Sequence, residues 1–352
     1  MKNKASRRNF IKQTSLGLSA GVFGISNPIS RARNDIKNGK LPREICISSI
    51  DLKGLWPDTT TESRIKRVLS RMGEVIGMKP DIICLPELFS TMWVKEKKAL
   101  TEIAEDEKIP GMITGRISAF AKKNHCYVVC PLVTKAGGYF YNSSLLIDRK
   151  GDIAGAYHKT HPVKTEIFPN QDFKGGGMRP GAIDQPVIET DFGKVGMQIS
   201  YDANWSDGWD NLKKKGVDIV LFSSSFPGGR ILNYHALKNS YYIVSSTVGD
   251  ARIIDISGND LDATSDFVRY AWATINLDKV NVTTWPTNGN LPDLFKKYGD
   301  RLRIKVWGNS DVITIESRDP QLQVSDVLKE FKIPNYTDYL KYETEVQDKH
   351  RI

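Results

Sequence analysis

Apolar residues along the chain follow two patterns, short continuous runs and longer segments with a repeat of three or four residues. The runs predict strands over 45–50, 81–85, 127–133, 139–147, 153–157, 195–199, 217–223 and 241–248. The repeats predict amphipathic helices over 58–78, 112–123, 206–215 and 231–239. Because strands and helices alternate along much of the chain, we expect an α/β fold with buried strands.

Two segments lack a regular pattern. Residues 158–181 contain Gly175-Gly176-Gly177 and Pro180-Gly181, and a loop of this length is usually functional. No Gly-Lys-Ser or Gly-Lys-Thr sequence follows these glycines, so they do not predict a phosphate-binding loop. Beyond Pro286 the chain is charged and rich in tyrosine, and 325–332 predicts one short helix.

The first 32 residues predict a twin-arginine (Tat) signal peptide. Ser6-Arg7-Arg8-Asn9-Phe10 precedes a mildly apolar segment at 16–25, and Ser30-Arg31-Ala32 supplies small residues for cleavage. The apolar segment is too short to span a bilayer and no cysteine lies near the cleavage point, so we expect no membrane anchor. The pattern predicts export in the folded state, to the periplasm or the cell exterior. The alternative is a disordered basic tail.

Charge and length narrow the functional classes. The net charge of +9 includes seven Lys or Arg and no acid within residues 1–33, which leaves about +2 for the rest. No basic stripe is interleaved with aromatic residues, so we expect no nucleic-acid partner. With 352 residues, 40% of them apolar and 26% charged, the chain is long enough for one large α/β domain or two small ones.

The four cysteines do not predict a metal site. Cys46, Cys84 and Cys130 lie inside apolar runs, and Cys126 directly precedes the last of these. We expect them to be small buried apolar residues, and a disulfide in an oxidising compartment is the alternative. Their spacing does not fit zinc, and the chain has only five histidines.

Glu87 and Lys159 each follow a predicted strand or hairpin and are candidates for catalysis. Glu87 comes after an apolar run and precedes Leu88 and Phe89, so its carboxylate should be partly desolvated and suited to accept a proton near neutral pH. Lys159 would stabilise the negative charge of a tetrahedral intermediate. Taken singly, each has an ordinary alternative, an exposed loop glutamate and a solvated lysine.

Ser200 is the third candidate and follows the apolar run 195–199 directly. A small nucleophilic side chain there would lie at the carboxyl edge of a sheet, where α/β enzymes place their active sites. The alternative is a turn or cap residue. Ser200 lacks the Gly-x-Ser-x-Gly pattern of serine hydrolases, and the one match to it, at 17–21, falls in the leader.

The surroundings of these residues resemble the carbon–nitrogen hydrolase (nitrilase) superfamily. Glutamate, lysine and the nucleophile position occur in this order, separated by 72 and 41 residues. The matching motifs are Leu85-Pro86-Glu87, Tyr141-Asn142-Ser143-Ser144 with Ile147-Asp148 and Gly151, Tyr157-His158-Lys159-Thr160-His161, Pro180-Gly181, the stretch from Gly193 to Asp202 with Trp205, Phe222-Ser223-Ser224, and His235 to Asn239. The resemblance covers about residues 44–285 and needs several ordered matches, which makes it specific.

The resemblance implies a fold, a chemistry and an assembly. The fold would be a four-layer α-β-β-α sandwich over 44–285, and the C-terminal extension at 286–352 would serve as a dimer arm in a homodimer or larger homo-oligomer. The activity would be an amidase-type hydrolysis of C–N bonds other than peptide bonds. Neither a metal nor an organic cofactor would be needed.

The resemblance also implies roles for single residues. Glu87 would be the general base and acid, and Lys159 would stabilise the oxyanion together with the backbone N–H of Tyr201. Glu166 would be an auxiliary glutamate. The nucleophile of the family is cysteine, and its position falls on Ser200. The expected pocket residues are Trp93, Tyr141, Ser223, Ser224 and Phe226, which favour a small linear amide or an N-carbamoyl compound as substrate.

Serine at position 200 leaves several interpretations open. A neighbouring lysine can draw a thiol to its thiolate, whereas a serine hydroxyl must lose its proton to a base during attack. The protein could be a hydrolase with an assisted serine, an inactive relative that binds an amide-like ligand, or a variant whose serine was introduced to trap a ligand. A structural or interaction protein is the fourth interpretation, and it predicts that Glu87, Lys159 and Ser200 lie far apart.

Overall fold

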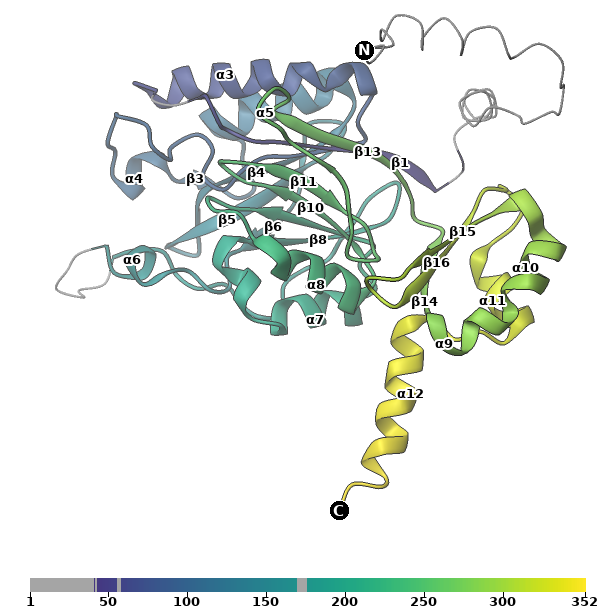
Figure 1. The fold of residues 1–352 in the computed structure, drawn as a ribbon. Helices are drawn as coiled ribbons and strands as arrows, with labels where there is room; N and C mark the ends of the chain where they lie inside the picture. Colours follow the sequence, from purple (N-terminus) through teal and green to yellow (C-terminus); the bar gives the residue numbers. More distant parts are fainter. Residues whose placement is uncertain (1–40, 42, 56–57, 170–175) are drawn as a thin grey trace, which may run out of the picture. The chain divides into compact units, whose positions relative to one another are not determined.

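The structure is a computed structural model that describes residues 41, 43–55, 58–169 and 176–352. Within these residues, two β-sheets stack face to face (Figure 1). The predicted leader lies outside these residues. The first sheet has the order β13-β1-β2-β4-β5-β6, with β3 paired to β4. Its strands are β1 (Glu44–Ile50), β2 (Ile82–Cys84), β3 (Glu105–Asp106), β4 (Tyr127–Ala136), β5 (Tyr139–Ile147), β6 (Ile153–His158) and β13 (Tyr270–Asn276).

The second sheet has the order β12-β11-β10-β9-β8-β7. Its strands are β7 (Ile188–Glu189), β8 (Lys194–Ile199), β9 (Ile219–Ser223), β10 (Tyr242–Ser246), β11 (Ala251–Ile254) and β12 (Asp260–Ala263). In both sheets the central strands are parallel, β1-β2-β4 in the first and β8-β9-β10 in the second. These strands are the nearly continuous apolar runs of the sequence, as expected for strands buried on both faces.

Apolar clusters stack the elements into four layers. Ile47, Val129, Met197 and Val244 belong to the cluster between the sheets. A second cluster joins helices α3 (Thr61–Glu74) and α5 (Met112–Asn124) to the outer face of the first sheet. A third joins α7 (Asp207–Lys214) and α8 (Gly229–Asn239) to the second sheet. Figure 1 shows the two helix pairs on opposite sides of the sheets, which is the expected α-β-β-α sandwich.

Helix α3 illustrates why these residues form these elements. Ile65, Val68 and Met72 are buried on one face, and the Thr60 side chain accepts the backbone N–H of Ser63 at 3.1 Å to cap the helix. The helix is shorter than the predicted 58–78, because the apolar repeat continues into a separate 3₁₀ turn at Ile76–Met78.

The parallel strands β2, β8 and β9 end at one common edge. Ile199, the last residue of β8, pairs with Ser223, the last residue of β9. The Ser223 hydroxyl donates to the carbonyl of Leu85, just beyond β2, at 2.8 Å. The carboxyl ends of strands from both sheets therefore meet, and the loops that follow them can form one site.

The C-terminal residues form a further sheet with the order β14-β16-β15. Its strands are β14 (Lys279–Thr283), β15 (Leu302–Trp307) and β16 (Val312–Ser317). The same part of the chain forms the helices α9 (Thr284–Thr287), α10 (Leu291–Tyr298) and α11 (Val324–Phe331). Val282, Ile313, Leu294 and Val327 belong to a separate buried cluster there. The predicted helix at 325–332 corresponds to α11, and the sheet begins before the boundary expected at 286.

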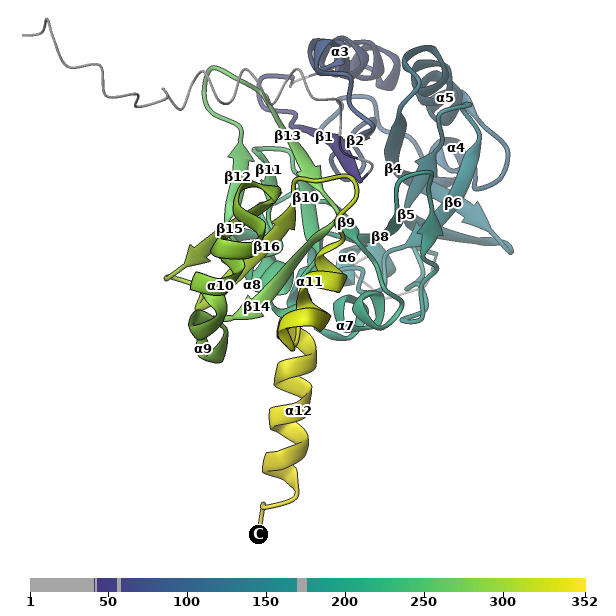
Figure 2. The ribbon, with the colours of Figure 1, turned by 90° about the vertical axis from the view of Figure 1, so that its right-hand side faces the viewer.

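The last element in the sequence is the helix α12 (Tyr336–Asp348), which contains no buried residue (Figure 2). None of the helices in the described ranges combines the length and apolar character needed to cross a membrane. Within the same ranges, no group of three or more His, Cys, Asp or Glu side chains is placed to hold a metal ion.

Candidate active site

Glu87 is buried just beyond β2, and hydrogen bonds hold both oxygens of its carboxylate. The side chain is 4% exposed. Oε1 accepts from Lys159 Nζ and from Asn142 Nδ2, each at 2.8 Å. Oε2 accepts the backbone N–H of Ser225 at 2.9 Å and its hydroxyl at 2.6 Å. The carboxylate is therefore fixed in one orientation, as a positioned general base must be.

Lys159 lies between two glutamates. Its Nζ donates to Glu87 at 2.8 Å and to Glu166 Oε2 at 2.9 Å, and its side chain is 3% exposed. Burial alone would lower the pKa of Lys159, but the charges of Glu87 and Glu166 and their hydrogen bonds raise it above its usual 10.5. Lys159 is therefore a fixed cation at neutral pH, and it can stabilise negative charge that develops beside it.

Asn142 and the short helix α6 (Lys164–Ile167) complete this cluster. Asn142, on β5, donates from Nδ2 to Glu87 at 2.8 Å and to Glu166 Oε1 at 2.6 Å. Glu166 Oε2 also accepts the backbone N–H of Val163 at 2.7 Å. The segment predicted to be irregular thus contains one helical turn, and that turn presents the second glutamate to Lys159.

Ser200 begins a 3₁₀ turn, Ser200–Asn204, that follows β8 directly. Its φ of 48° is a left-handed conformation, uncommon for a residue other than glycine. Residues in such conformations persist only where their surroundings hold them, and they concentrate at functional sites. Seven other non-glycine residues among those described also have a positive φ, so it is the place of Ser200 directly after β8 that makes it a candidate.

Asp202 is the residue that holds this turn in place. Its carboxylate accepts the backbone N–H of Ile199 at 2.9 Å, the Tyr157 hydroxyl at 2.8 Å and the backbone N–H of His161 at 2.7 Å. The His161 ring also lies within 3.1 Å of it through Nδ1. Because Tyr157 and His161 flank Lys159 in the chain, Asp202 ties the serine turn to the segment that carries the lysine.

The structure joins Glu87 and Lys159 directly and places Ser200 at the same edge. The residue before Ser200 pairs with Ser223, two residues before the Ser225 that binds Glu87. Among the residues that the structure describes, the Ser200 hydroxyl has no hydrogen-bond partner. The wide separation that a purely structural protein predicts is not found between Glu87 and Lys159.

A small cavity of about 150 Å³ opens at Ser200. Two of the expected pocket residues, Ser224 and Phe226, line it together with Tyr201. Phe226 is 68% exposed and Tyr201 46% exposed, so both side chains are accessible from solvent.

The other three expected pocket residues lie elsewhere. The Ser223 side chain is fully buried, and its hydroxyl donates a hydrogen bond to the carbonyl of Leu85. The Tyr141 ring stacks on His158, with the ring centroids 4.0 Å apart. Trp93 lines a second cavity, which Leu88, next to Glu87, also lines.

Sequence interpretation missed the roles of Ser225, Asn142 and Asp202. All three are at least nine-tenths buried, and each binds a candidate residue or its turn. Asn142 and Asp202 lie inside motifs that the sequence analysis identified. A polar side chain within a predicted strand is the feature of the sequence that could have indicated a role for Asn142. Nothing distinguishes Ser225 from Ser223 and Ser224 in the sequence, because its contact with Glu87 spans 138 residues.

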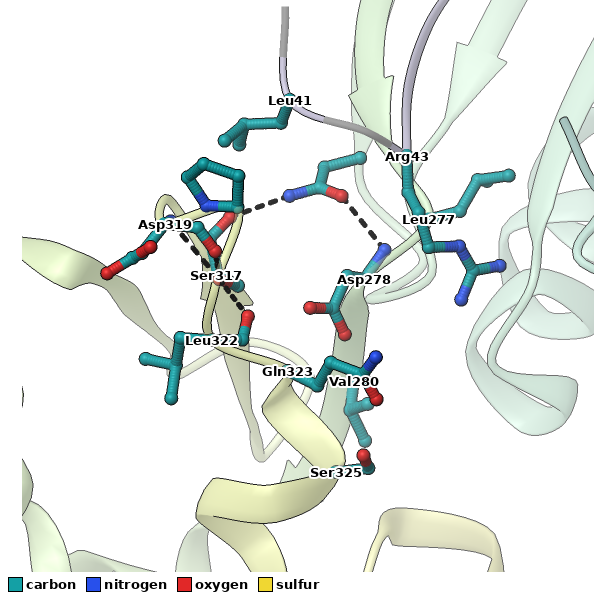
Figure 3. A pocket seen from close by; sticks show the side chains of 12 residues that line it. Leu41, Arg43, Leu277, Asp278, Val280, Ser317, Asp319, Leu322, Gln323 and Ser325 are labelled. Carbon is teal, nitrogen blue, oxygen red and sulfur yellow. Dashed lines mark hydrogen bonds between the residues drawn. The ribbon is translucent and has the colours of Figure 1, made fainter.

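Another cavity, of about 310 Å³, lies between the β13–β14 turn and the segment before α11 (Figure 3). Several of its polar groups bond one another. Asn276 donates to the Ser317 carbonyl at 2.7 Å, and the Val324 backbone N–H donates to the Asp278 carboxylate at 3.2 Å. None of the candidate catalytic residues lines this cavity, so it is separate from the site at Glu87.

The protein resembles solved structures over most of the sandwich. A carbon–nitrogen hydrolase from Helicobacter pylori G27 aligns with a TM-score of 0.54 at 17% identity, covering 67% of this chain and 90% of that one. An amidase from Nesterenkonia sp. aligns with a TM-score of 0.55 at 14% identity, covering 68% and 94%. At these low identities the similarity shows a shared fold and nothing about function.

Sequence comparison extends this likeness to the family. A nitrilase of Pyrococcus abyssi is 30% identical over 188 residues, which are 52% of this chain and 68% of that protein. A deaminated glutathione amidase of Dictyostelium discoideum is 24% identical over 279 residues, 70% of this chain and 93% of that protein. The carbon–nitrogen hydrolase family model matches residues 49–284, which include the Glu87–Lys159 pair and the Ser200 turn, and the chain therefore belongs to the carbon–nitrogen hydrolase family.

Proposed function

We propose that the protein hydrolyses the C–N bond of a small linear amide or N-carbamoyl compound, with Ser200 as the nucleophile. The observation that carries this proposal is the buried Lys159, held between two carboxylates at the strand edge where the Ser200 turn begins. Burying a cation and two carboxylates costs free energy unless they pair well, and a protein without a task for them has little reason to keep them.

The proposed reaction uses one general base twice. Ser200 Oγ attacks the carbonyl carbon and its proton passes to Glu87, while Lys159 and the Tyr201 backbone N–H stabilise the oxyanion. Glu87 then gives this proton to the leaving nitrogen, and ammonia or an amine departs from the acyl-serine. A water molecule loses a proton to Glu87 as it attacks the ester. The tetrahedral intermediate formed in this way then collapses. The acid is released, and Glu87 returns the proton to Ser200 Oγ.

The remaining site residues take supporting roles in this proposal. Glu166 keeps Lys159 charged and in position through the bond at 2.9 Å. Ser224 and Phe226 would contact the substrate in the cavity at Ser200, whereas Trp93 lines the second cavity and Tyr141 stacks on His158. Ser223 would not contact the substrate, and its hydrogen bond to the Leu85 carbonyl would hold the residues that follow β2 in place. No step needs a metal or an organic cofactor.

A second candidate function is an inactive relative that binds an amide-like ligand. The observation in its favour is that Ser200 has no hydrogen-bonded base among the described residues, while both oxygens of Glu87 are engaged by other donors. A serine with no base to take its proton attacks slowly. Each added 1.4 kcal/mol of barrier slows the reaction about tenfold.

One assay separates the two functions. The parent protein, Ser200→Ala and Ser200→Cys are compared for ammonia release from a panel of amides, nitriles and N-carbamoyl amino acids. Turnover by the parent that is lost in Ser200→Ala supports the serine hydrolase. Turnover by Ser200→Cys alone supports the inactive relative, since the cysteine would restore a nucleophile that Lys159 can activate.

We also propose that the chain is exported by the twin-arginine pathway. The support is the sequence pattern of residues 1–32. A fractionation experiment tests it by comparing the parent with the double variant Arg7→Lys, Arg8→Lys, which keeps the charge. Periplasmic or secreted protein from the parent alone is expected, and equal export of both would refute the proposal.

A further inference from the structure

Donors among the described residues occupy every lone-pair position of the Glu87 carboxylate. An ionised carboxylate offers about two such positions on each oxygen. Oε1 accepts from Lys159 Nζ and Asn142 Nδ2, and Oε2 accepts both the backbone N–H and the hydroxyl of Ser225. A general base must nevertheless receive a proton, so one of these donors has to leave or reverse its direction.

The Ser225 hydroxyl differs from the other three donors because it can reverse. The lysine cation, the Asn142 amide nitrogen and the backbone N–H donate hydrogen bonds and cannot accept them. A hydroxyl does both, and no donor to Ser225 Oγ is found among the described residues. Its hydrogen bond to Glu87 measures 2.6 Å, as expected for an O–H group that donates to a charged carboxylate. Ser225 Oγ can therefore take up one proton while it passes its own to Oε2.

The chain around Ser225 lines the small cavity at Ser200. Ser224 and Phe226, on either side of Ser225, both belong to the cavity wall. The Ser224 hydroxyl donates to the Phe226 carbonyl and accepts the Phe226 backbone N–H at 3.0 Å, and the Ser224 backbone N–H donates to the Ser246 carbonyl at 2.9 Å. These bonds fix the backbone of Ser225, so its hydroxyl is held one residue from the wall of the cavity where the attacking group is proposed to lie.

We propose that Glu87 exchanges its proton with the reacting groups through the Ser225 hydroxyl. The inference rests on the proposed amide hydrolysis and adds a step to it. As Ser200 Oγ attacks, its proton passes to Ser225 Oγ while the Ser225 proton passes to Glu87 Oε2. The reverse transfer delivers a proton to the leaving nitrogen and restores the Ser225 hydroxyl. Water uses the same path in the second half of the reaction, so a direct hydrogen bond between Ser200 and Glu87 is not required.

Rates in mixtures of H₂O and D₂O test this relay. The substrate is a slow amide, so that the chemical step limits kcat/KM. Two protons that move in one step make the rate curve downward as the D₂O fraction rises, whereas one proton gives a straight line. We expect a curved plot for the parent and a straight plot for Ser225→Ala. In this variant kcat should fall about 10²-fold while KM changes by less than about twofold, because Ser225 does not bind the substrate.

Two further serine variants separate a relay from a structural role. Ser223→Ala is the matched control, since Ser223 is also buried and its hydroxyl binds the Leu85 carbonyl instead of Glu87. Its plot should stay curved whatever its rate. Ser225→Thr keeps the hydroxyl and should recover at least about tenfold of the loss in kcat. A straight plot for the parent, a curved plot for Ser225→Ala, or a threonine variant no faster than the alanine variant would overturn the inference.

The same variants in a Ser200→Cys background serve if the parent does not turn over. Water must still give its proton to Glu87 there, so the plots are measured on kcat with a substrate whose acyl-enzyme is hydrolysed slowly. The same curved and straight plots are expected. If neither the parent nor Ser200→Cys releases ammonia from any amide, the proposed function is refuted and the relay with it. Turnover with a straight plot in both backgrounds refutes the relay alone.

Discussion

Serine at position 200 lies in a tight turn at the strand edge where we propose that the nucleophile stands. The residue adopts a left-handed φ of 48°, and hydrogen bonds to Asp202 hold its turn. Elsewhere in the described chain, buried thiols are poorly suited to substitute. Burial raises the pKa of Cys84 to about 12 and that of Cys126 to about 11. The proposed chemistry at this edge therefore rests on position 200 and not on these thiols.

Alkylation of Ser200→Cys tests the setting of this position. We expect iodoacetamide at pH 6.5 to label the new thiol about tenfold faster than that of Ser206→Cys, because in the proposed site the cation of Lys159 favours the thiolate. Peptide mass spectrometry locates the adduct. Ser206 is exposed and supplies the ordinary reactivity for comparison. Equal labelling rates at the two positions would show that position 200 has no activating environment.

Asp202 should be essential for the geometry of the turn. In Asp202→Asn, one carboxylate oxygen becomes an amide nitrogen that must face two N–H or O–H donors. We expect the free energy of unfolding to fall by about 2 kcal/mol, measured by urea denaturation. Asp207→Asn is the control, because Asp207 is 38% exposed and 3.7 Å from His161, and it should change stability by less than about 0.5 kcal/mol. Similar losses in both variants would contradict this role.

How much of the site could be predicted differs from residue to residue. Glu87, Lys159 and Ser200 each follow an apolar run that ends at one sheet edge, and their motifs resembled a family. The Ser225 contact with Glu87 could not be predicted, because it joins residues 138 apart through the stacking of two sheets. Trp93 lines a different cavity from Ser224, since the left-handed turns at Leu88 and Trp93 redirect that loop.

At the scale of elements, apolar runs predicted the central strands well and the peripheral ones poorly. β5 has the predicted bounds, and β8 and β9 differ from prediction by two residues at most. β15 was missed because Arg303 and Lys305 alternate with apolar residues on a strand that is mostly exposed. Continuous apolar runs mark strands that are buried on both faces, whereas a strand with one apolar face alternates, so a prediction from runs does not detect it.

Helix α8 supports the serine turn through His235, and this predicts a pH dependence. His235 Nε2 lies 2.9 Å from the Ala203 carbonyl, so Nε2 carries the proton of a neutral ring. Burial lowers the pKa of His235, although the Ala203 hydrogen bond opposes this. The unfolded chain, with a histidine pKa near 6.5, takes up a proton first as the pH falls. The contribution of His235 to stability is therefore complete above about pH 6.5 and is lost below it.

The measurement compares the free energy of unfolding at pH 8 and pH 5 for the parent and His235→Gln. We expect the parent to lose more stability on acidification than the variant, whose amide can still donate to Ala203 but does not titrate. A larger acid loss in His235→Gln would mean that the histidine gains a proton favourably in the folded state, and the assigned neutral ring would be wrong.

At the scale of the whole molecule, we expect α12 to mediate the proposed homodimer. Tyr339, Tyr342 and Val346 recur at three- and four-residue steps, and no residue of the helix is buried. A chain ending at Asn335 should sediment as a monomer while the full chain sediments as a dimer. Tyr342→Glu should also dissociate the dimer, whereas Lys341→Glu, off this stripe, should not. A dimer that survives the truncation would place the interface elsewhere.

Transfer of the acyl group to hydroxylamine tests directly whether Ser200 forms an acyl-enzyme. An acyl-serine at position 200 would react with hydroxylamine to give a hydroxamate and the free hydroxyl, so its formation can be followed without the intermediate accumulating. We predict that the parent converts a small linear amide to its hydroxamate, and that Ser200→Ala is slower by at least about 10³-fold. Equal rates for the parent and Ser200→Ala, with hydroxamate formed only by Ser200→Cys, would show that Ser200 is not a nucleophile.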